Sequence, residues 1–180
     1  TTLTGDVDIS GNLHNQGIIY QTSTSGGGFY APMVKNGSLL GGSSTTTGRL
    51  RIKVPHYVAN AMQSFIIDIY EYNTDRMQSI MVGGYSYDPG DGSAPWYNTS
   101  AIALMDSDNR DLTVRFGADT SASANYVAVG ETNTTWTYPQ VVVRNYMSGH
   151  STSSSEFLGA FTIEFVTTDG ATYNVNHDNN

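Results

Sequence analysis

The sequence predicts an all-β protein, an antiparallel β-sandwich or jelly-roll domain that follows a short extended segment. Charged residues make up only 13% of the 180 residues, and 12 tyrosines outnumber 6 phenylalanines, a composition typical of β-rich extracellular or virion proteins. From residue 49 onward, apolar and polar residues alternate with the period of two that strands require. Nowhere does an apolar spacing of three and four persist over the ~10 residues that a stable helix needs.

Residues 1–48 differ in character from the rest of the chain. Leu3, Val7, Ile9 and Leu13 alternate with small or polar residues, and glycine runs interrupt the sequence that follows them. Such a segment buries too little apolar surface to fold alone. Two interpretations stay open: three copies share one core along a common axis, as in a fibre shaft, or the segment is a flexible linker.

Residues 49–180 are predicted to form one domain of about eight or nine strands. The alternation directs the apolar side chains of the first two strands, in RLRIKV and SFIIDIYEY, to one face: Leu50, Ile52, Val54, Phe65, Ile67 and Ile69. Further strands are expected in QSIMVGGY, DLTVRFG, NYVAVGE, TYPQVVVRN, FLGAFTIEFV and TYNVN. The connections, such as DPGDG and ETNTT, are rich in turn residues, and short turns between successive strands indicate antiparallel pairing.

Charge and composition exclude several classes of partner. Sixteen acidic residues against eight basic ones give a net charge of −8, which repels nucleic-acid phosphate and anionic lipid. No apolar run approaches the roughly 18 residues of a membrane span, and no basic and apolar signal opens the sequence. Without cysteine, neither a disulfide nor a thiolate metal site can form. We therefore expect no nucleic-acid partner, no membrane insertion and no cofactor.

Catalytic motifs are absent from the sequence. It contains no G-x-S-x-G, H-E-x-x-H or G-x-x-x-x-G-K segment, and its histidines lie far apart. Glycosidases need two carboxylates about 5–9 Å apart, for which the candidates are Asp68 with Glu71 and Asp88 with Asp91. Strand alternation sends the first pair to opposite faces, and DPGDG, which holds the second pair, is a turn sequence. We predict that the chain is not an enzyme.

The segment DSDNRD contains weak candidates for metal ligands. Asp106, Asp108 and Asp111 resemble the start of a calcium loop. However, Arg110 occupies the fifth position, where its charge opposes a cation, and the sixth position lacks the glycine that the sharp turn requires. A hairpin turn explains the segment better than a metal site, and no metal is predicted.

One predicted strand is strongly basic. Arg49, Arg51 and Lys53 project from the same face of it. They either face an anionic glycan such as lipopolysaccharide or teichoic acid, or pair with acidic residues of an adjacent strand or subunit. Pairing is the favoured interpretation.

GGYSYDPGDGSAPWYNTSA, residues 83–101, combines the side chains that protein sites for neutral glycans use. Tyrosine and tryptophan rings stack on the apolar faces of sugars, while amides and carboxylates take the hydroxyl groups. The candidate glycan-binding residues are Tyr85, Tyr87, Asp88, Asp91, Trp96, Tyr97 and Asn98. Alternatively, the segment only connects two strands, and its rings pack over the sheet edge or against a neighbouring subunit. Trp136 and Tyr138 are expected in the core or in an interface.

Three segments together carry a family resemblance. GGYSYDPGDGSAPWYNTSA, LTVRFGAD and YVAVGETNTTWTYPQVVVRN resemble the C-terminal β-sandwich domain of tail fibres from bacteriophages and phage-like contractile injection particles, while TLTGDVDISGNL resembles the shaft segments that precede such domains. The resemblance covers residues 49–177 and 1–20. It implies a homotrimeric fibre tip on a virion or extracellular particle, joined to the rest of the fibre and without chemistry of its own.

The leading hypothesis is therefore a receptor-binding tip that attaches a particle to a bacterial surface receptor, a glycan. A second hypothesis is a structural domain that caps the trimer without binding a receptor. A third is a glycan depolymerase with Asp68, Asp88 or Asp91 as its acids.

Overall fold

The computed structural model describes residues 20–22, 28–39, 44–55, 61–87, 96–108, 110, 112–119, 121–150 and 157–177. Within these residues the chain is all-β and every strand pairing is antiparallel, as the sequence predicts. The strands are β1 (Gln21–Thr22), β2 (Phe29–Leu39), β3 (Thr46–Thr47), β4 (Arg49–Lys53), β5 (Ala61–Glu71), β6 (Arg76–Ser86), β7 (Trp96–Asp106), β8 (Val114–Asp119), β9 (Ala124–Val129), β10 (Thr135–Trp136), β11 (Pro139–His150), β12 (Thr162–Val166) and β13 (Thr172–His177). In the described part of the chain, no helix has the length and apolarity needed to cross a membrane.

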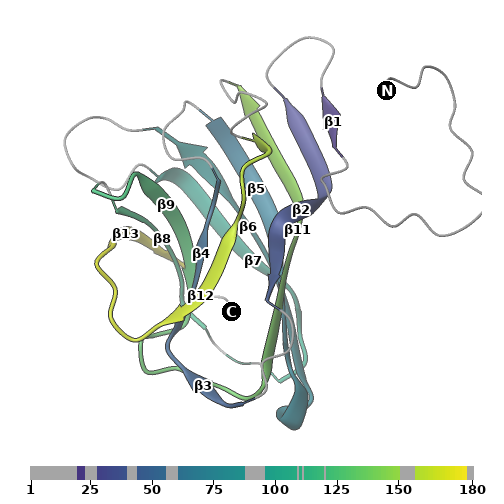
Figure 1. Ribbon diagram of the computed structural model, residues 1–180, viewed down its shortest axis with the longest axis vertical. Coiled ribbons are helices and arrows are strands. Elements are labelled where there is room, and N and C mark those ends of the chain that lie inside the picture. The colour runs from purple at the N-terminus through teal and green to yellow at the C-terminus, as the bar shows by residue number, and fades with distance from the viewer. Residues whose placement is uncertain are drawn as a thin grey trace, which may run out of the picture.

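The strands form two large sheets that face each other (Figure 1). The six-stranded sheet has the order β1-β2-β11-β5-β6-β7, and the five-stranded sheet has the order β12-β4-β9-β8-β13. A third, small sheet pairs β3 with β10. A short 3₁₀ turn, η1 (Tyr72–Thr74), joins β5 to β6.

Strand alternation sorts the side chains as predicted. In β5 the burial class changes at every residue, with Phe65, Ile67 and Ile69 directed inward. Leu50 and Ile52 of β4 are also buried. Because successive side chains of a strand point to opposite faces, the period of two in the sequence is enough to decide which residues of β4 and β5 enter the core.

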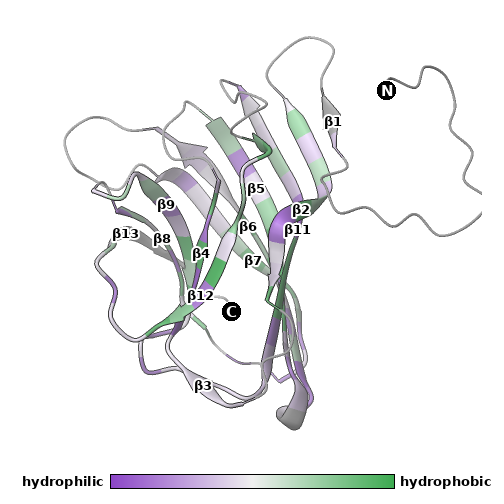
Figure 2. Cartoon of the chain, viewed as in Figure 1, coloured by the Kyte–Doolittle hydropathy of each residue, from purple (hydrophilic) through white to green (hydrophobic). Residues whose placement is uncertain are grey.

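Aromatic side chains fill much of the space between the two sheets. Trp96 of β7 packs edge-on against Phe116 of β8, with their ring centroids 5.4 Å apart, and Phe65 of β5 lies 5.6 Å from Phe161. Trp136 is fully buried, as expected, and its indole nitrogen donates a hydrogen bond to the Gly48 carbonyl. Hydrophobic residues accordingly recur along the strands of both sheets (Figure 2).

The expected boundary between residues 48 and 49 is not a structural boundary. Strand β2 belongs to the six-stranded sheet, where it pairs with β11, and its Ala31 is buried in the core. The pairing satisfies the outer backbone groups of β11, which would otherwise form an open sheet edge. The sequence obscured this strand because FYAPMVKNGSL alternates poorly, and its register against β11 is interrupted by a bulge. The shaft-like residues 1–19 lie outside the described residues.

Strand β7 was not among the predicted strands. Its register against β6 shifts twice, and each shift adds one residue to β7. The first extra residue falls between Tyr97 and Ser100, and the second falls between Ala103 and Met105. Each bulge reverses the parity of the residues that follow, so the sequence of β7 lacks a continuous period of two.

Candidate functional site

Three of the predicted binding tyrosines gather at one end of the six-stranded sheet. Tyr85 of β6 lies directly opposite Tyr97 of β7, and the Tyr85 and Tyr87 rings stack with centroids 6.4 Å apart and planes inclined by 14°. The side chains of Tyr87 and Tyr97 are 43% and 39% exposed. These three residues, called the tyrosine cluster below, present aromatic surface to solvent beside the connection between β6 and β7.

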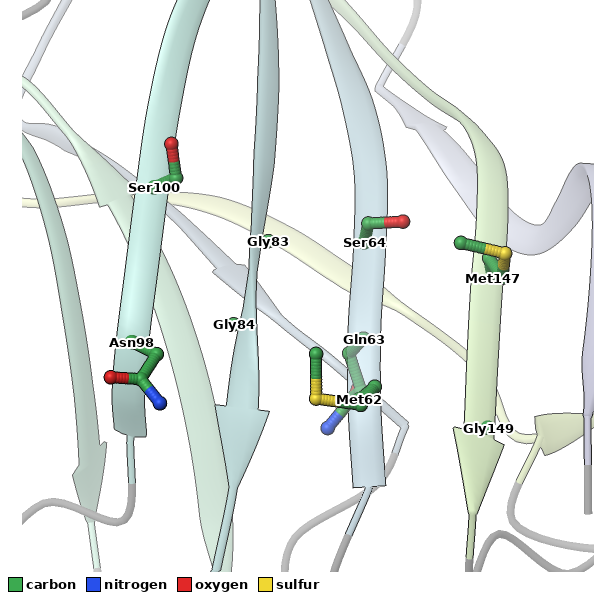
Figure 3. A pocket seen from close by; sticks show the side chains of 9 residues that line it. All are labelled: Met62, Gln63, Ser64, Gly83, Gly84, Asn98, Ser100, Met147 and Gly149. Atoms are coloured by element: carbon green, nitrogen blue, oxygen red, sulfur yellow. The ribbon is translucent and has the colours of Figure 1, made fainter.

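Asn98 follows Tyr97 in β7 and falls within the first bulge. Its backbone is left-handed, with a φ of 48°, a conformation that asparagine adopts more readily than most residues. The side chain is exposed and points toward Gly84 from the β7 side, while Met62 approaches from the β5 side (Figure 3). Bulges often redirect a side chain in this way near binding sites.

A shallow hollow of about 340 Å³ lies next to the tyrosine cluster and extends across four strands (Figure 3). The hollow forms because three cross-strand neighbours on β5, β6 and β7 have small side chains or none. They are Ser64, Gly83 and Ser100. Met147 of β11 lies opposite Ser64 and closes one end of this row. The hollow therefore offers an apolar wall with amide and hydroxyl groups close by.

Trp96 does not belong to this surface, in contrast to the prediction. Its side chain is only 2% exposed, it packs on Phe116, and its indole nitrogen donates a 3.1 Å hydrogen bond to the Gly117 carbonyl. Trp96 and Tyr97 are adjacent in β7 and therefore point to opposite faces of the sheet. The other predicted ligands of the loop, Asp88 and Asp91, lie outside the described residues.

The first candidate pair of catalytic carboxylates is separated by the sheet, as the alternation predicts. Asp68 projects from the outer face, where it accepts hydrogen bonds from Ser79 and Arg144. Glu71 points inward and is paired with Arg110. Both carboxylates thus have structural partners, and they do not face a common cavity.

The two described aspartates of the DSDNRD segment, Asp106 and Asp108, both have structural partners. Asp106 accepts hydrogen bonds from the Gln78 amide and from the Asp108 backbone nitrogen, at 3.1 and 3.2 Å. Asp108 pairs with Arg76, while Asp111 lies outside the described residues. Among the residues that are described, no three His, Asp or Glu side chains gather as metal ligands.

The basic strand pairs with acidic side chains, as favoured from the sequence. Arg49 and Arg51 both contact Asp169, with N–O distances of 3.3 and 2.8 Å. Arg49 also pairs with Glu131, and Arg51 with Glu164. Asp169 further accepts a 2.6 Å hydrogen bond from the Tyr173 hydroxyl. The arginines are therefore committed to neutralising carboxylates of their own chain.

Asp169 should make folding sensitive to acid. Burial raises the pKa of its carboxyl group, but hydrogen bonds from Tyr173 and the Ala171 amide, with the charge of Arg51, lower the pKa overall. A carboxyl group with a lowered folded-state pKa stabilises the protein above its unfolded pKa of about 3.9, and this contribution disappears as the pH falls through the folded-state pKa.

We expect Asp169→Asn to reduce the free energy of unfolding at pH 7 by about 1.5–3 kcal/mol, the range for hydrogen bonds to charged groups. The variant should also lose less stability than the parent chain on acidification below about pH 4. Urea unfolding at pH 7 and pH 3 measures both effects. Equal pH dependence in the two proteins would assign the acid sensitivity to other carboxylates.

The hollow contains residues that the sequence analysis did not select. Met62, Ser64, Ser100 and Met147 come from three different strands, and nothing in the sequence of any one strand indicates that they meet. The sequence does indicate that Met62 and Ser64 project from the outer face of β5, because they alternate with buried residues. It does not indicate which residues of the neighbouring strands lie beside them.

Comparison of the chain with protein-family models, with curated proteins and with solved structures found no match. The site must therefore be interpreted from its own chemistry. It combines exposed tyrosine rings, an asparagine amide and a shallow hollow, which suits binding rather than bond cleavage.

Proposed function

We propose that this chain is the β-sandwich tip of a tail fibre and that it attaches a bacteriophage or phage-like particle to a glycan on the bacterial surface. The observation that carries the proposal is the tyrosine cluster, whose exposed rings lie at one end of a sheet next to a hollow that Asn98 lines. Sugar rings present apolar C–H faces to such aromatic rings and hydroxyl groups to such amides. The location proposed for the chain is accordingly the virion or an extracellular particle.

The proposed assembly is a homotrimer that is joined to the rest of the fibre through the shaft-like N-terminal segment. Shallow sites bind sugars weakly one at a time. Three copies per fibre, and several fibres per particle, convert weak contacts into stable attachment because each additional binding event is intramolecular. The proposal includes no catalytic step, since Asp68 and Glu71 are separated by the sheet and each has a basic partner.

Alanine substitution in the tyrosine cluster tests the proposal. We expect Tyr87→Ala and Tyr97→Ala each to weaken binding of the purified chain to immobilised glycan about two- to tenfold, since a ring contact contributes roughly 0.5–1.5 kcal/mol. The probes are purified lipopolysaccharide, capsular polysaccharide and teichoic acid, with biolayer interferometry as the readout. Tyr72→Ala is the matched control, because Tyr72 is also exposed but follows the opposite end of β5.

The alternatives predict different outcomes in the same assay. Equal binding by parent chain, cluster variants and control would contradict a glycan site at the tyrosine cluster. An intact trimer that binds none of the glycans would favour the structural cap, and release of reducing sugar would favour the depolymerase.

A further inference from the structure

All six methionines of the chain are exposed, with 40–72% of each side chain accessible. They come from β2, β5, β6, β7 and β11, the neighbouring strands of the six-stranded sheet. Register relates several of them directly: Met81 lies opposite Ile66 and Ile102, and Met77 lies opposite Tyr70. The outer side of this sheet, opposite the core, is called the methionine face below.

The methionine face is not flat, because rows of large and small side chains alternate across it. A row of small residues crosses three strands, and a row of large residues flanks it on each side. Cross-strand pairing gives these rows as Ser64, Gly83 and Ser100 for the trough, Met62, Tyr85 and Tyr97 for one ridge, and Ile66, Met81 and Ile102 for the other. Two hollows, of about 340 and 210 Å³, follow this relief.

Charge on the methionine face is balanced within four of its strands, whereas Lys35 of β2, the strand that also carries Met33, is exposed. Within β5, β6, β7 and β11, the charged side chains that project from it are Asp68 and Arg144, which bind each other. The rest of the described chain carries dense ion pairs instead, as around Asp169. A second methionine face brought against the first would therefore meet no unpaired charge in these four strands, although each copy has a net charge of −8.

The exposed apolar area is too large for an ordinary monomer surface. The accessible parts of the methionines, of Ile102 and Leu104, and of the neighbouring tyrosines amount to on the order of 1,000 Å², whereas the largest apolar patch of a typical monomer is ≈ 300–600 Å². A stable protein interface buries ≈ 800 Å² on each partner. The methionine face has the size and composition of one side of such an interface.

We propose that the methionine face is the surface through which copies of this chain contact each other. Methionine side chains are long, unbranched and adaptable, so the ridge of Ile66, Met81 and Ile102 can interdigitate with the methionine face of a neighbouring copy. The number of copies, three, rests on the proposed function, whereas the choice of surface does not. Contact through this ridge leaves the opposite ridge, which carries Tyr85 and Tyr97, at the margin of the interface, where a glycan can reach it.

Absolute mass in solution tests the inference. For the full chain we expect about three times 19.4 kDa by light scattering. Ile102→Lys should reduce the mass threefold, because a cation is placed at the centre of the face on a side chain that is 57% exposed and lies outside the hydrophobic core. Thr172→Lys, at an exposed position of β13 in the other sheet, should leave the mass unchanged. A monomeric parent chain, or a trimeric Ile102→Lys variant, would overturn the inference.

Cysteine cross-linking provides a second measurement on a chain that contains no cysteine. We expect Met81→Cys to form covalent dimers with a short bis-maleimide reagent, and Thr172→Cys to remain uncoupled at the same concentration. If the Met81→Cys thiol is instead shielded from maleimide in a monomer, another segment of the same chain covers the face and the inference is wrong.

These results are separable from those for glycan binding. Loss of glycan binding with an intact trimer would contradict the proposed function alone. A monomer that binds glycan through Tyr97 would contradict the inference alone.

Discussion

Trp96→Ala should lower the free energy of unfolding by about 3–5 kcal/mol, the range for truncating a large buried aromatic side chain. The indole is almost completely buried, packs on Phe116 and donates a hydrogen bond to the Gly117 carbonyl. Its position also depends on Gly84, where an added Cβ would lie 3.2 Å from the indole ring. Truncation therefore leaves a cavity between β7 and the five-stranded sheet and removes the hydrogen bond to the Gly117 carbonyl.

Urea unfolding followed by circular dichroism measures this effect, at one fixed chain concentration because association shifts apparent stability. The matched control is Tyr97→Ala, which removes the neighbouring but exposed ring and should cost much less stability. The two variants together separate folding from binding. A Trp96→Ala protein that keeps its stability but loses glycan binding would return Trp96 to the binding site and contradict its assignment to the core.

Arg110→Met should also destabilise the fold strongly, by about 3–5 kcal/mol, because it leaves a buried carboxylate without its counter-ion. Glu71 is only 1% exposed. Its carboxylate binds Arg110 and accepts a 2.7 Å hydrogen bond from the Thr137 backbone nitrogen. The Arg110 guanidinium lies 4.6 Å from the centre of the Trp136 ring and donates a hydrogen bond to the Thr135 carbonyl. The pair thus joins three segments that are distant in sequence.

A double-mutant cycle with Glu71→Gln distinguishes the lost ion pair from lost packing. If the uncompensated charge causes the damage, the double variant Glu71→Gln/Arg110→Met should be more stable than Arg110→Met alone. Strictly additive losses would mean that Arg110 acts through its packing on Trp136. A loss below about 0.5 kcal/mol for Arg110→Met, typical of an ordinary surface position, would contradict a structural role for the pair.

Tryptophan and tyrosine at adjacent positions illustrate how far sequence reasoning reached in the candidate site. Both Trp96 and Tyr97 were predicted to bind a ligand, and the structure directs them to opposite faces. Strand alternation shows which of two adjacent residues faces the core only when the first residue of the strand and the positions of its bulges are known. In β7 the bulges interrupt the alternation, so the sequence contained the right residue types without the information to sort them.

The N-terminal boundary was misjudged for a related reason. Strand β2 has few large apolar residues and an irregular register, and it is held by pairing with β11, more than one hundred positions later in the chain. Such a strand depends on its partner for backbone hydrogen bonds, and local composition does not report the partner.

What the sequence determined by itself is the all-β class, the antiparallel pairing, the inward face of strands such as β4 and β5, and the separation of Asp68 from Glu71. These features depend on local geometry, since successive side chains of a strand alternate and short turns reverse its direction. What only the tertiary structure decided is which residues meet: Tyr85 with Tyr97, Asp169 with two arginines, and six methionines on one face. Those contacts depend on strand order and register, which are set by the cooperative packing of the two sheets.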